Sequence, residues 1–217
     1  KSSRRKQARP GELLSAALDL FVEKGYASTR VEEVAQRAGV SKGTLFLYFA
    51  SKEDLFKAVG RENLSVRFPQ WSIVLDGYPG TSAEILRFAM HEWWSQIGDT
   101  KVSGISKLII SEASNFPELA LFYQREVIEP GNALIRRILQ RGVERGEFRA
   151  LDLQYAVHTV IAPMLYLIIA KYSFGACVPQ NKVLVPIDYL DAQVDILLNG
   201  FRVVPTNPSV LPGTPPP

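Results

Sequence analysis

Residues 29–56, TRVEEVAQRAGVSKGTLFLYFASKEDLF, decide the fold of this chain. They predict two short helices joined by a tight turn at Gly39, where a left-handed glycine ends a helix at no steric cost, and a third helix just after. Thr29, followed three residues later by a glutamate, predicts a capping box at the first helix. Ser41 and Ser51 are good N-caps for the second and third helices. The stretch therefore predicts a helical unit with sharply defined helix ends.

The spacing of Ala35, Gly39 and Leu45 is what a helix-turn-helix requires. A small residue lets the two helices approach, the glycine makes the turn, and the aliphatic side chain holds the second helix against the first. The second helix, residues 41–49, is then short, rigid and open to a DNA major groove. The alternative is a generic helical hairpin, but the agreement between caps, turn and apolar register favours the helix-turn-helix.

Two segments of the chain resemble a known family. Residues 39–56, GVSKGTLFLYFASKEDLF, preceded by one amphipathic helix, resemble the DNA-binding domain of the TetR family of bacterial transcriptional regulators, over about residues 10–57. Residues 105–130, ISKLIISEASNFPELALFYQREVIEP, resemble the regulatory domain of the AcrR-like branch of that family. The resemblance implies a homodimer that binds a palindromic operator in double-stranded DNA, takes a small-molecule effector and needs no cofactor.

The charge distribution agrees with a DNA-binding module at the N-terminus. The chain has 217 residues, an ordinary globular composition and a net charge of +3. Residues 1–60 hold 11 Lys and Arg against 7 Asp and Glu, whereas the remainder holds 14 against 15. The basic surplus therefore lies with the helix-turn-helix, as phosphate binding requires.

Cysteine and hydropathy point to a soluble, cytoplasmic protein. Cys177 is the one cysteine, which excludes an internal disulfide and fits a reducing compartment. The longest unbroken apolar run, residues 160–170, is shorter than the ~18 residues that a membrane span needs. No signal peptide is visible. We expect no membrane partner.

Every ordered segment has a helical period, so the predicted fold is all-α, with four parts. Residues 1–9 form a flexible basic arm, which is either a solvated tail or a further DNA contact. Residues 10–57 form the helix-turn-helix domain, and residues 58–203 a larger helical domain for ligand binding and dimerisation. Residues 204–217, rich in proline, are predicted to be disordered.

The predicted DNA contacts centre on the second helix of the motif. Lys42 lies at its N-terminal end, where a long cation reaches a base edge such as guanine O6 or N7. Gly43 has no side chain, so the backbone can lie close to DNA. The resemblance implies phosphate contacts from Thr44, Tyr48 and Lys52. The full predicted set is Thr29, Arg30, Ser41, Lys42, Gly43, Thr44, Phe46, Leu47, Tyr48 and Lys52.

Phe46 and Leu47 depart from the TLYxYF pattern that is common in the family. Phe46 lacks the hydroxyl that the usual tyrosine offers a phosphate, and Leu47 is apolar where solvent exposure is expected. In one interpretation Leu47 packs on the first helix of the domain. In the other, both side chains contact thymine methyl groups and give the operator a T in each half-site.

Two helices of the larger domain carry apolar seams at spacings of three and four, which predict a symmetric four-helix dimer interface. The alternative is that both seams face the core of the monomer. The predicted interface residues are Val157, Val160, Met164, Leu190, Val194, Leu197 and Phe201.

Bulky or polar residues within otherwise apolar helices are the candidates for an effector pocket. The predicted set is His91, Trp94, Phe122, Tyr123 and Tyr166, with Trp93, Phe116, Tyr155 and His158 also considered. Adjacent Trp93 and Trp94 lie ~100° apart on a helix, so at most one can face the centre of a cavity. The ligand is expected to be apolar or aromatic, with one or two hydrogen-bonding groups.

Enzyme function is not expected. His91 and His158 lie far apart in the sequence without an HExxH or Cys-His pattern, so no metal site is predicted, and no glycine-rich phosphate loop or GxSxG motif occurs. The sequence favours a dimeric repressor that a small apolar or aromatic effector releases from its operator. One alternative is a constitutive DNA-binding regulator whose C-terminal helices serve dimerisation alone. Another is a helical scaffold that has lost DNA binding.

Overall fold

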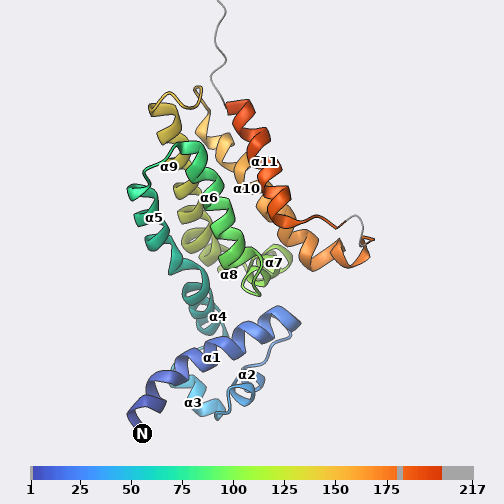
Figure 1. Cartoon of the computed structure of the whole chain (residues 1–217). Helices are drawn as coiled ribbons and strands as arrows, with labels where there is room; N and C mark the ends of the chain where they lie inside the picture. The colour runs from blue at the N-terminus through green and yellow to red at the C-terminus, as the bar shows by residue number, and fades with distance from the viewer. Residues whose placement is uncertain (1, 180–182, 202–217) are drawn as a thin grey trace, which may run out of the picture.

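The computed structural model describes residues 2–179 and 183–201, and within them the chain is helical without strands. The predicted all-α fold is therefore confirmed for this part. A small unit of three helices lies at one end of an elongated molecule, and α4 leads from it into a larger bundle (Figure 1). The predicted proline-rich tail, residues 204–217, lies outside the described residues.

The small unit consists of α1 (Ser2–Lys24), α2 (Val31–Arg37) and α3 (Lys42–Phe46). Gly39 follows α2 with φ of +68°, the left-handed conformation expected of the turn. The Ser41 hydroxyl accepts a hydrogen bond from the Thr44 amide at 3.0 Å and caps α3. Leu45 is fully buried against the other two helices. The predicted turn, cap and apolar register of the helix-turn-helix are thus all present.

The segment predicted to be a flexible basic arm has a helical backbone. Residues 2–9 belong to α1, which does not begin at Pro10 but runs through it. Lysine, arginine, glutamine and alanine in this segment are good helix formers. Pro10 removes the one amide bond to the Lys6 carbonyl, and the neighbouring turns continue the helix on either side. The first helix is therefore longer than its apolar stripe.

The connection between the two units is helical throughout. The Ser51 hydroxyl accepts from the Asp54 amide at 3.0 Å and caps α4 (Lys52–Gly60), as predicted. A π-helical turn, η1 (Arg61–Ser65), then leads to α5 (Arg67–Gly77). Pro69 lies in the first turn of α5, where its missing amide proton has no helical partner.

The larger unit is a bundle of the remaining helices. Their bounds are α6 (Ser82–Trp93), η2 (Trp94–Gly98), α7 (Ser103–Glu112), α8 (Pro117–Tyr123), η3 (Gln124–Ile128), α9 (Glu129–Glu144), α10 (Leu153–Ile169), η4 (Ala170–Phe174), η5 (Gly175–Cys177) and α11 (Pro186–Phe201). Pro130 and Gly131 both lie in the first turn of α9, which continues directly from η3.

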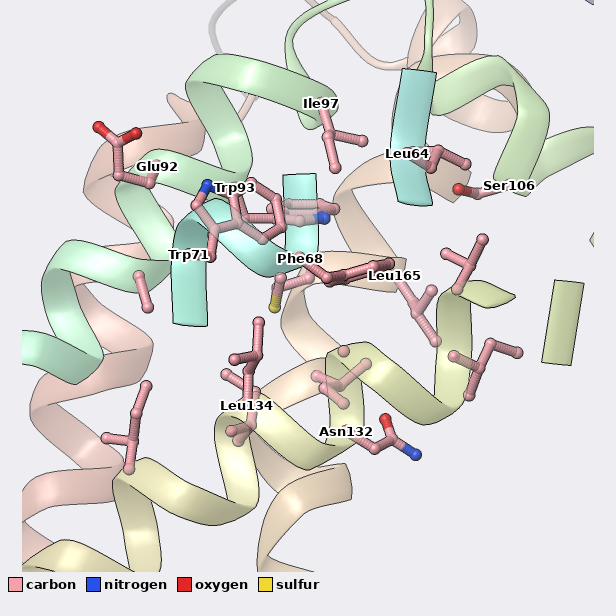
Figure 2. Close-up of a pocket in the computed structure, with 18 of the residues that line it drawn as sticks. Leu64, Phe68, Trp71, Glu92, Trp93, Ile97, Ser106, Asn132, Leu134 and Leu165 are labelled. Atoms are coloured by element: carbon pink, nitrogen blue, oxygen red, sulfur yellow. The ribbon is translucent and has the colours of Figure 1, made fainter. Parts of the chain in front are cut away.

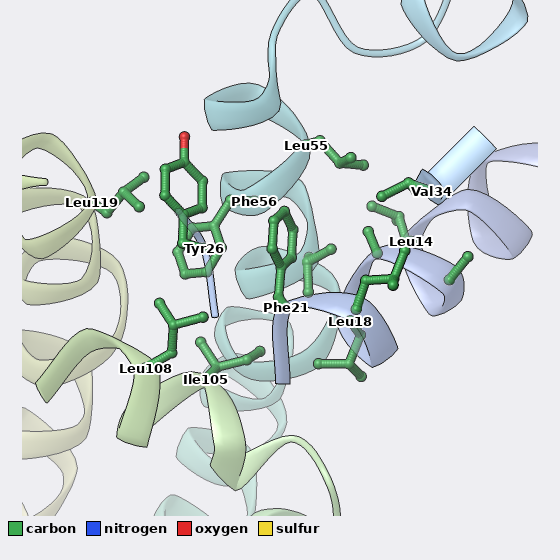
Figure 3. Packing of buried hydrophobic residues seen from close by; sticks show 14 of the residues in the cluster. Leu14, Leu18, Phe21, Tyr26, Val34, Leu55, Phe56, Ile105, Leu108 and Leu119 are labelled. Carbon is green, nitrogen blue, oxygen red and sulfur yellow. The ribbon is translucent and has the colours of Figure 1, made fainter. Parts of the chain in front are cut away.

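One hydrophobic core crosses from the small unit into the bundle. Leu18, Phe21 and Phe56 of the small unit and α4 pack in one buried cluster with Ile105 and Leu108 of α7 (Figure 3). A second cluster joins α5, α6, α9, α10 and α11. The helix-turn-helix is therefore not an independent domain on a linker, because residues of the bundle complete its hydrophobic core.

Candidate functional site

The α3 helix presents an open face at the tip of the small unit. Lys42, Gly43, Phe46 and Tyr48 are exposed, and the side chain of Leu47 is 83% exposed. The interpretation in which Leu47 packs on the first helix is therefore wrong. An aliphatic side chain left this open to water at the end of a rigid helix is available to a partner surface.

Exposed ion pairs lie beside this face. The Lys42 ammonium lies 2.5 Å from Glu32 and also over the Phe46 ring, 5.8 Å from its centroid. The Arg37 guanidinium donates to both carboxylate oxygens of Glu23 at 2.9 Å. All of these groups are substantially exposed, so the pairs contribute little stability, and phosphates can compete for the cations.

Thr29 has a structural role that excludes it from the predicted DNA contacts. Its hydroxyl donates within a buried site, 2.7 Å from the Gly25 carbonyl oxygen and 3.2 Å from that of Leu20. The N-cap of α2 is Arg30, one residue later than predicted, and the Glu33 carboxylate accepts from the Arg30 amide at 3.4 Å. Arg30, which was also predicted to contact DNA, is exposed.

Lys52 also differs from its predicted role as a phosphate contact. Its ammonium donates to the carbonyl oxygens of Tyr26 (2.9 Å), Ala27 (3.3 Å) and Thr29 (3.2 Å), and it lies 4.4 Å from the centroid of the Tyr26 ring. An ammonium has three protons, so these three carbonyls use all of them. Burial lowers the pKa of Lys52, although the carboxylate of Glu112 works against this shift. Lys52 therefore ties the loop between α1 and α2 to the start of α4.

Glu112, at the end of α7, holds the same loop from the bundle side. Its carboxylate oxygens accept hydrogen bonds from the amides of Tyr26 (2.8 Å) and Ala27 (3.1 Å). The Tyr26 ring packs edge-on against Phe116 with centroids 4.8 Å apart. Gly104 of α7 also lies so close to α1 that an added Cβ would meet Val22 at 2.6 Å. The small unit of α1, α2 and α3, called the reading unit below, is thus held to α7 and α8 by polar and apolar contacts.

A cavity of about 340 Å³ lies within the bundle, between α5, α6, α7, α9 and α10. Its wall is almost wholly apolar and aromatic, and Trp71, Trp93 and Phe68 are among the rings that line it (Figure 2). Its volume lies in the range typical of small-molecule sites. Sequence reasoning did not place α5 at the wall, although the aromatic spacing of Phe68 and Trp71 was visible.

Comparison with known proteins decides the family. A model of bacterial regulatory proteins of the tetR family matches residues 13–59, and a model of the tetracyclin repressor-like C-terminal domain matches residues 80–173. The chain belongs to the TetR family. It is accordingly a DNA-binding transcriptional regulator and not an enzyme. Its placement in the AcrR-like branch stays a prediction.

The relatives match either a short segment of the chain closely or most of the chain more distantly. The HTH-type transcriptional regulator RutR of Escherichia coli (strain K12) is 48% identical over 66 residues, which is 30% of this chain and 31% of RutR. The HTH-type transcriptional regulator YdeS of Bacillus subtilis (strain 168) is 25% identical over 160 residues, 71% of this chain and 75% of YdeS. The structure of FadR from Bacillus subtilis in complex with stearoyl-CoA has the same fold, with a TM-score of 0.70 and 20% identity over 88% of this chain and 98% of FadR.

Of the five predicted effector residues of this TetR-family chain, Tyr123 alone lines the cavity. Trp94 and Phe122 are buried in the two cores, and Tyr166 lies on the outer face of α10 beside Tyr189. Of the two adjacent tryptophans it is Trp93 that faces the cavity. His158, which was considered and left out, also lines it.

His91 lies on the side of α6 away from this cavity. Its Nε2 is 2.8 Å from an Asp191 oxygen on α11, and Arg87 donates to the same oxygen at 2.6 Å. Burial alone would raise the pKa of Asp191, but hydrogen bonds from Arg87 and His91 outweigh it and lower the pKa. His91 therefore helps to join α6 to α11 and does not line this cavity, so its role in effector binding stays a prediction. No cluster of metal-ligating side chains occurs in the described ranges.

The predicted dimer seam faces the core of the monomer. Six of its seven residues are buried and Leu197 is half-buried: Val157, Val160, Met164, Leu190, Val194, Leu197 and Phe201. The most regular apolar stripe of a helix is the one that the folded monomer itself needs. The opposite faces of α10 and α11 stay exposed, and their large apolar residues are Tyr155, Tyr166, Ile169 and Ile196.

One helix in the described part, Leu153–Ser173, is long and apolar enough to cross a membrane by length and composition. This is weak evidence, because the core helix of a water-soluble protein passes the same test. Val157, Val160, Leu167 and Ile168 of this helix are buried inside the protein. The helix is thus accounted for by its place in the bundle.

Proposed function

We propose that this chain is a cytoplasmic, dimeric repressor that leaves its operator when a small apolar or aromatic molecule fills the bundle cavity. One observation carries the proposal: the cavity and the reading unit share a wall. Leu64, Ile109 and Tyr123 line the cavity and also belong to the buried cluster that contains Phe21 and Phe56 of the reading unit and α4.

The shared wall supplies the physical requirement for regulation. A ligand changes an equilibrium only through a difference in its affinity for two states. A molecule that fills the cavity presses on α7 and α8, and these helices hold the loop between α1 and α2 through Glu112 and Phe116. Filling the cavity is therefore expected to tilt α1 and α4 and to change the separation of the two reading helices in a dimer.

A second copy of this chain is the proposed partner of the outer faces of α10 and α11. Tyr155, Tyr166 and Ile169 follow one another along α10, and Ile196 lies on the neighbouring exposed face of α11. Two such helix pairs can meet across a two-fold axis as a four-helix interface. The dimer would present two α3 helices to half-sites about 34 Å apart on one face of the DNA.

The apolar cavity supports an effector with a large hydrocarbon part. FadR from Bacillus subtilis, which shares the fold, was solved in complex with stearoyl-CoA. The fatty acid metabolism regulator protein of the same organism is 26% identical over 156 residues. These likenesses make lipid-like molecules the first compounds to test.

The test starts from an operator obtained by selection from random duplex DNA. Compounds that quench tryptophan fluorescence, and thus reach Trp71 and Trp93, are added to the operator complex while fluorescence anisotropy is followed. The proposal predicts that bound compounds weaken operator binding. A matched control, Ala89→Phe, narrows the cavity and should keep operator binding but lose the response. If compounds bind and operator affinity never changes, the chain is a constitutive regulator.

A further inference from the structure

A pair of hydroxyl groups lies in the wall of the cavity. The hydroxyl oxygens of Ser106 on α7 and Tyr123 on α8 are 2.7 Å apart, and both residues are buried. Both line the cavity, and Figure 2 shows the Ser106 side chain beside Leu64. Among the hydrogen bonds of the described residues, the bond between these two hydroxyls is the one polar contact of either side chain.

The pair has hydrogen-bonding capacity left over. Two hydroxyl groups carry two protons and four lone pairs, and one mutual hydrogen bond uses one proton and one lone pair. The remaining proton can therefore be donated to an acceptor in the cavity. A polar group kept in an apolar wall at a cost in desolvation is expected to have a partner in the working protein.

The wall has no permanently charged cation, and His158 is the one residue of its lining that can become cationic. Its residues include no lysine and no arginine, and the one carboxylate, Glu92, is directed away from the other labelled side chains (Figure 2). That carboxylate accepts a hydrogen bond from Gln96 on its own helical stretch. Burial raises the pKa of Tyr123 to about 12, even though the hydrogen bond to Ser106 works in the opposite direction. Such surroundings penalise any charged group.

From these observations we propose that Ser106 and Tyr123 anchor the effector, and that the effector is an uncharged, mainly hydrocarbon molecule bearing a hydrogen-bond acceptor such as a carbonyl oxygen. This rests on the proposed function, since it names the ligand class of the same cavity. The free hydroxyl donates a hydrogen bond to the ligand oxygen, and the hydrocarbon part of the ligand packs against the aromatic side chains of the cavity wall. A carboxylate, phosphate or ammonium group on the ligand must stay outside the cavity.

The anchor also lies next to the path toward the reading unit. Tyr123 belongs to the buried cluster that contains Tyr26, whose amide is held by Glu112. A ligand oxygen that accepts a hydrogen bond from the pair is therefore bound at the wall shared with the DNA-binding helices. An acceptor placed here acts on α7 and α8 together, because the two hydroxyls come from these two helices.

A matched series of ten-carbon probes tests the proposal on the full chain without DNA. Tryptophan fluorescence is titrated at about pH 8 with 2-decanone, 1-decene, decanoate and decylammonium, two neutral and two charged at that pH. We expect 2-decanone to bind about ten-fold more tightly than either ion. An ion whose head group reaches the hydroxyl pair loses its hydration, and an ion whose head group stays outside makes no hydrogen bond to the pair. Decanoate or decylammonium binding as tightly as 2-decanone, or no binding by any probe, overturns the proposal.

The double variant Ser106→Ala, Tyr123→Phe tests the anchor itself. Removing both partners of a hydrogen bond together leaves no unpaired group, so the protein should fold normally, which thermal unfolding checks. The variant should bind 2-decanone about five-fold to ten-fold more weakly and 1-decene equally well. Equal affinity for 2-decanone in variant and wild type contradicts the anchor. The probe series needs no variant, so it decides the ligand class even if the variant does not fold.

These experiments separate the two proposals. Probe binding in the absence of DNA decides the ligand class and the anchor. The effect of a bound probe on operator affinity decides the proposed regulation. A neutral probe that binds through the hydroxyl pair and leaves operator affinity unchanged would sustain the anchor and refute the regulatory function.

Discussion

Replacing Lys52 by methionine separates a structural lysine from a DNA-contacting one. The Lys52 ammonium donates three hydrogen bonds to carbonyl oxygens of the loop between α1 and α2, of which those of Tyr26 and Thr29 are partly buried. At about 1 to 1.5 kcal/mol for each partly buried bond and little for the exposed one, Lys52→Met should cost about 2 to 3 kcal/mol of folding free energy. For a chain of this size that lowers Tm by about 4 to 12 °C.

The same variant makes a separate prediction for DNA. Each phosphate contact contributes about 0.9 to the slope of log affinity against log salt concentration, so a dimer that lost two contacts would lose about 1.8. Because the three protons of Lys52 are used within the protein, we expect the slope to stay as in wild type. The assays are thermal unfolding by circular dichroism and fluorescence anisotropy between about 50 and 200 mM salt.

Lys42→Met is the matched control. Lys42 is exposed and pairs with Glu32 on the surface, so its loss should change stability by less than about 1 kcal/mol but should weaken DNA binding clearly. The reasoning on Lys52 is refuted if Lys52→Met leaves Tm unchanged and reduces the salt slope by nearly two.

Three further predictions concern single side chains. Leu47→Ala should leave stability unchanged, because the side chain is 83% exposed, and should reduce discrimination for one T-containing base pair by about 1 kcal/mol; an equal loss on every sequence would speak against thymine contacts. Ile196→Glu should convert the dimer to a folded monomer in sedimentation, whereas Ile73→Glu, at an equally exposed position on α5, should stay dimeric; a dimeric Ile196→Glu would move the interface elsewhere. The lowered pKa of Asp191 means that its contribution to stability is present above about pH 4 and is lost as pH falls through the folded-state pKa. The Tm of Asp191→Asn and the Tm of wild type should therefore differ less and less as pH falls from about 6 to 3. A Tm difference that does not change with pH would contradict a stabilising role for the ionised Asp191 carboxylate.

The reading unit was largely predictable because its signals are local. Gly39, Ser41 and Ser51 determine helix ends through contacts within four residues, and these contacts were visible as spacing. Thr29 is the exception, although it is followed by Glu32 at the spacing of a capping box. The tertiary fold turns its hydroxyl toward Leu20 instead, and Arg30 becomes the N-cap.

The cavity was not predictable in the same way, because it depends on which helices surround each helix. Trp93 and Trp94 are adjacent and chemically identical, and only the positions of α5 and α9 turn the first toward the cavity and the second toward the core. The lining role of Trp71 could have been anticipated only by knowing that α5 packs against α9.

The residues predicted for the dimer seam face the core of the monomer for a general physical reason. Val157, Val160 and Val194 form the clearest apolar stripe of their helices, and a monomer buries its clearest stripe first. A surface that must also be tolerable in water before assembly mixes aromatic, small and polar residues. Tyr155 and Ile169 belong to such a face, which periodicity alone does not distinguish from an ordinary surface.

Operator binding by this chain tests the central claim most directly. A duplex selected from random DNA is titrated by fluorescence anisotropy, with Lys42→Met as the control for the reading helix. The account predicts a two-fold symmetric selected sequence, tight and salt-dependent binding by wild type, and clear weakening by the variant. Selection without a consensus, and affinity no higher than for a random duplex, would contradict the claim that the exposed face of α3 reads DNA.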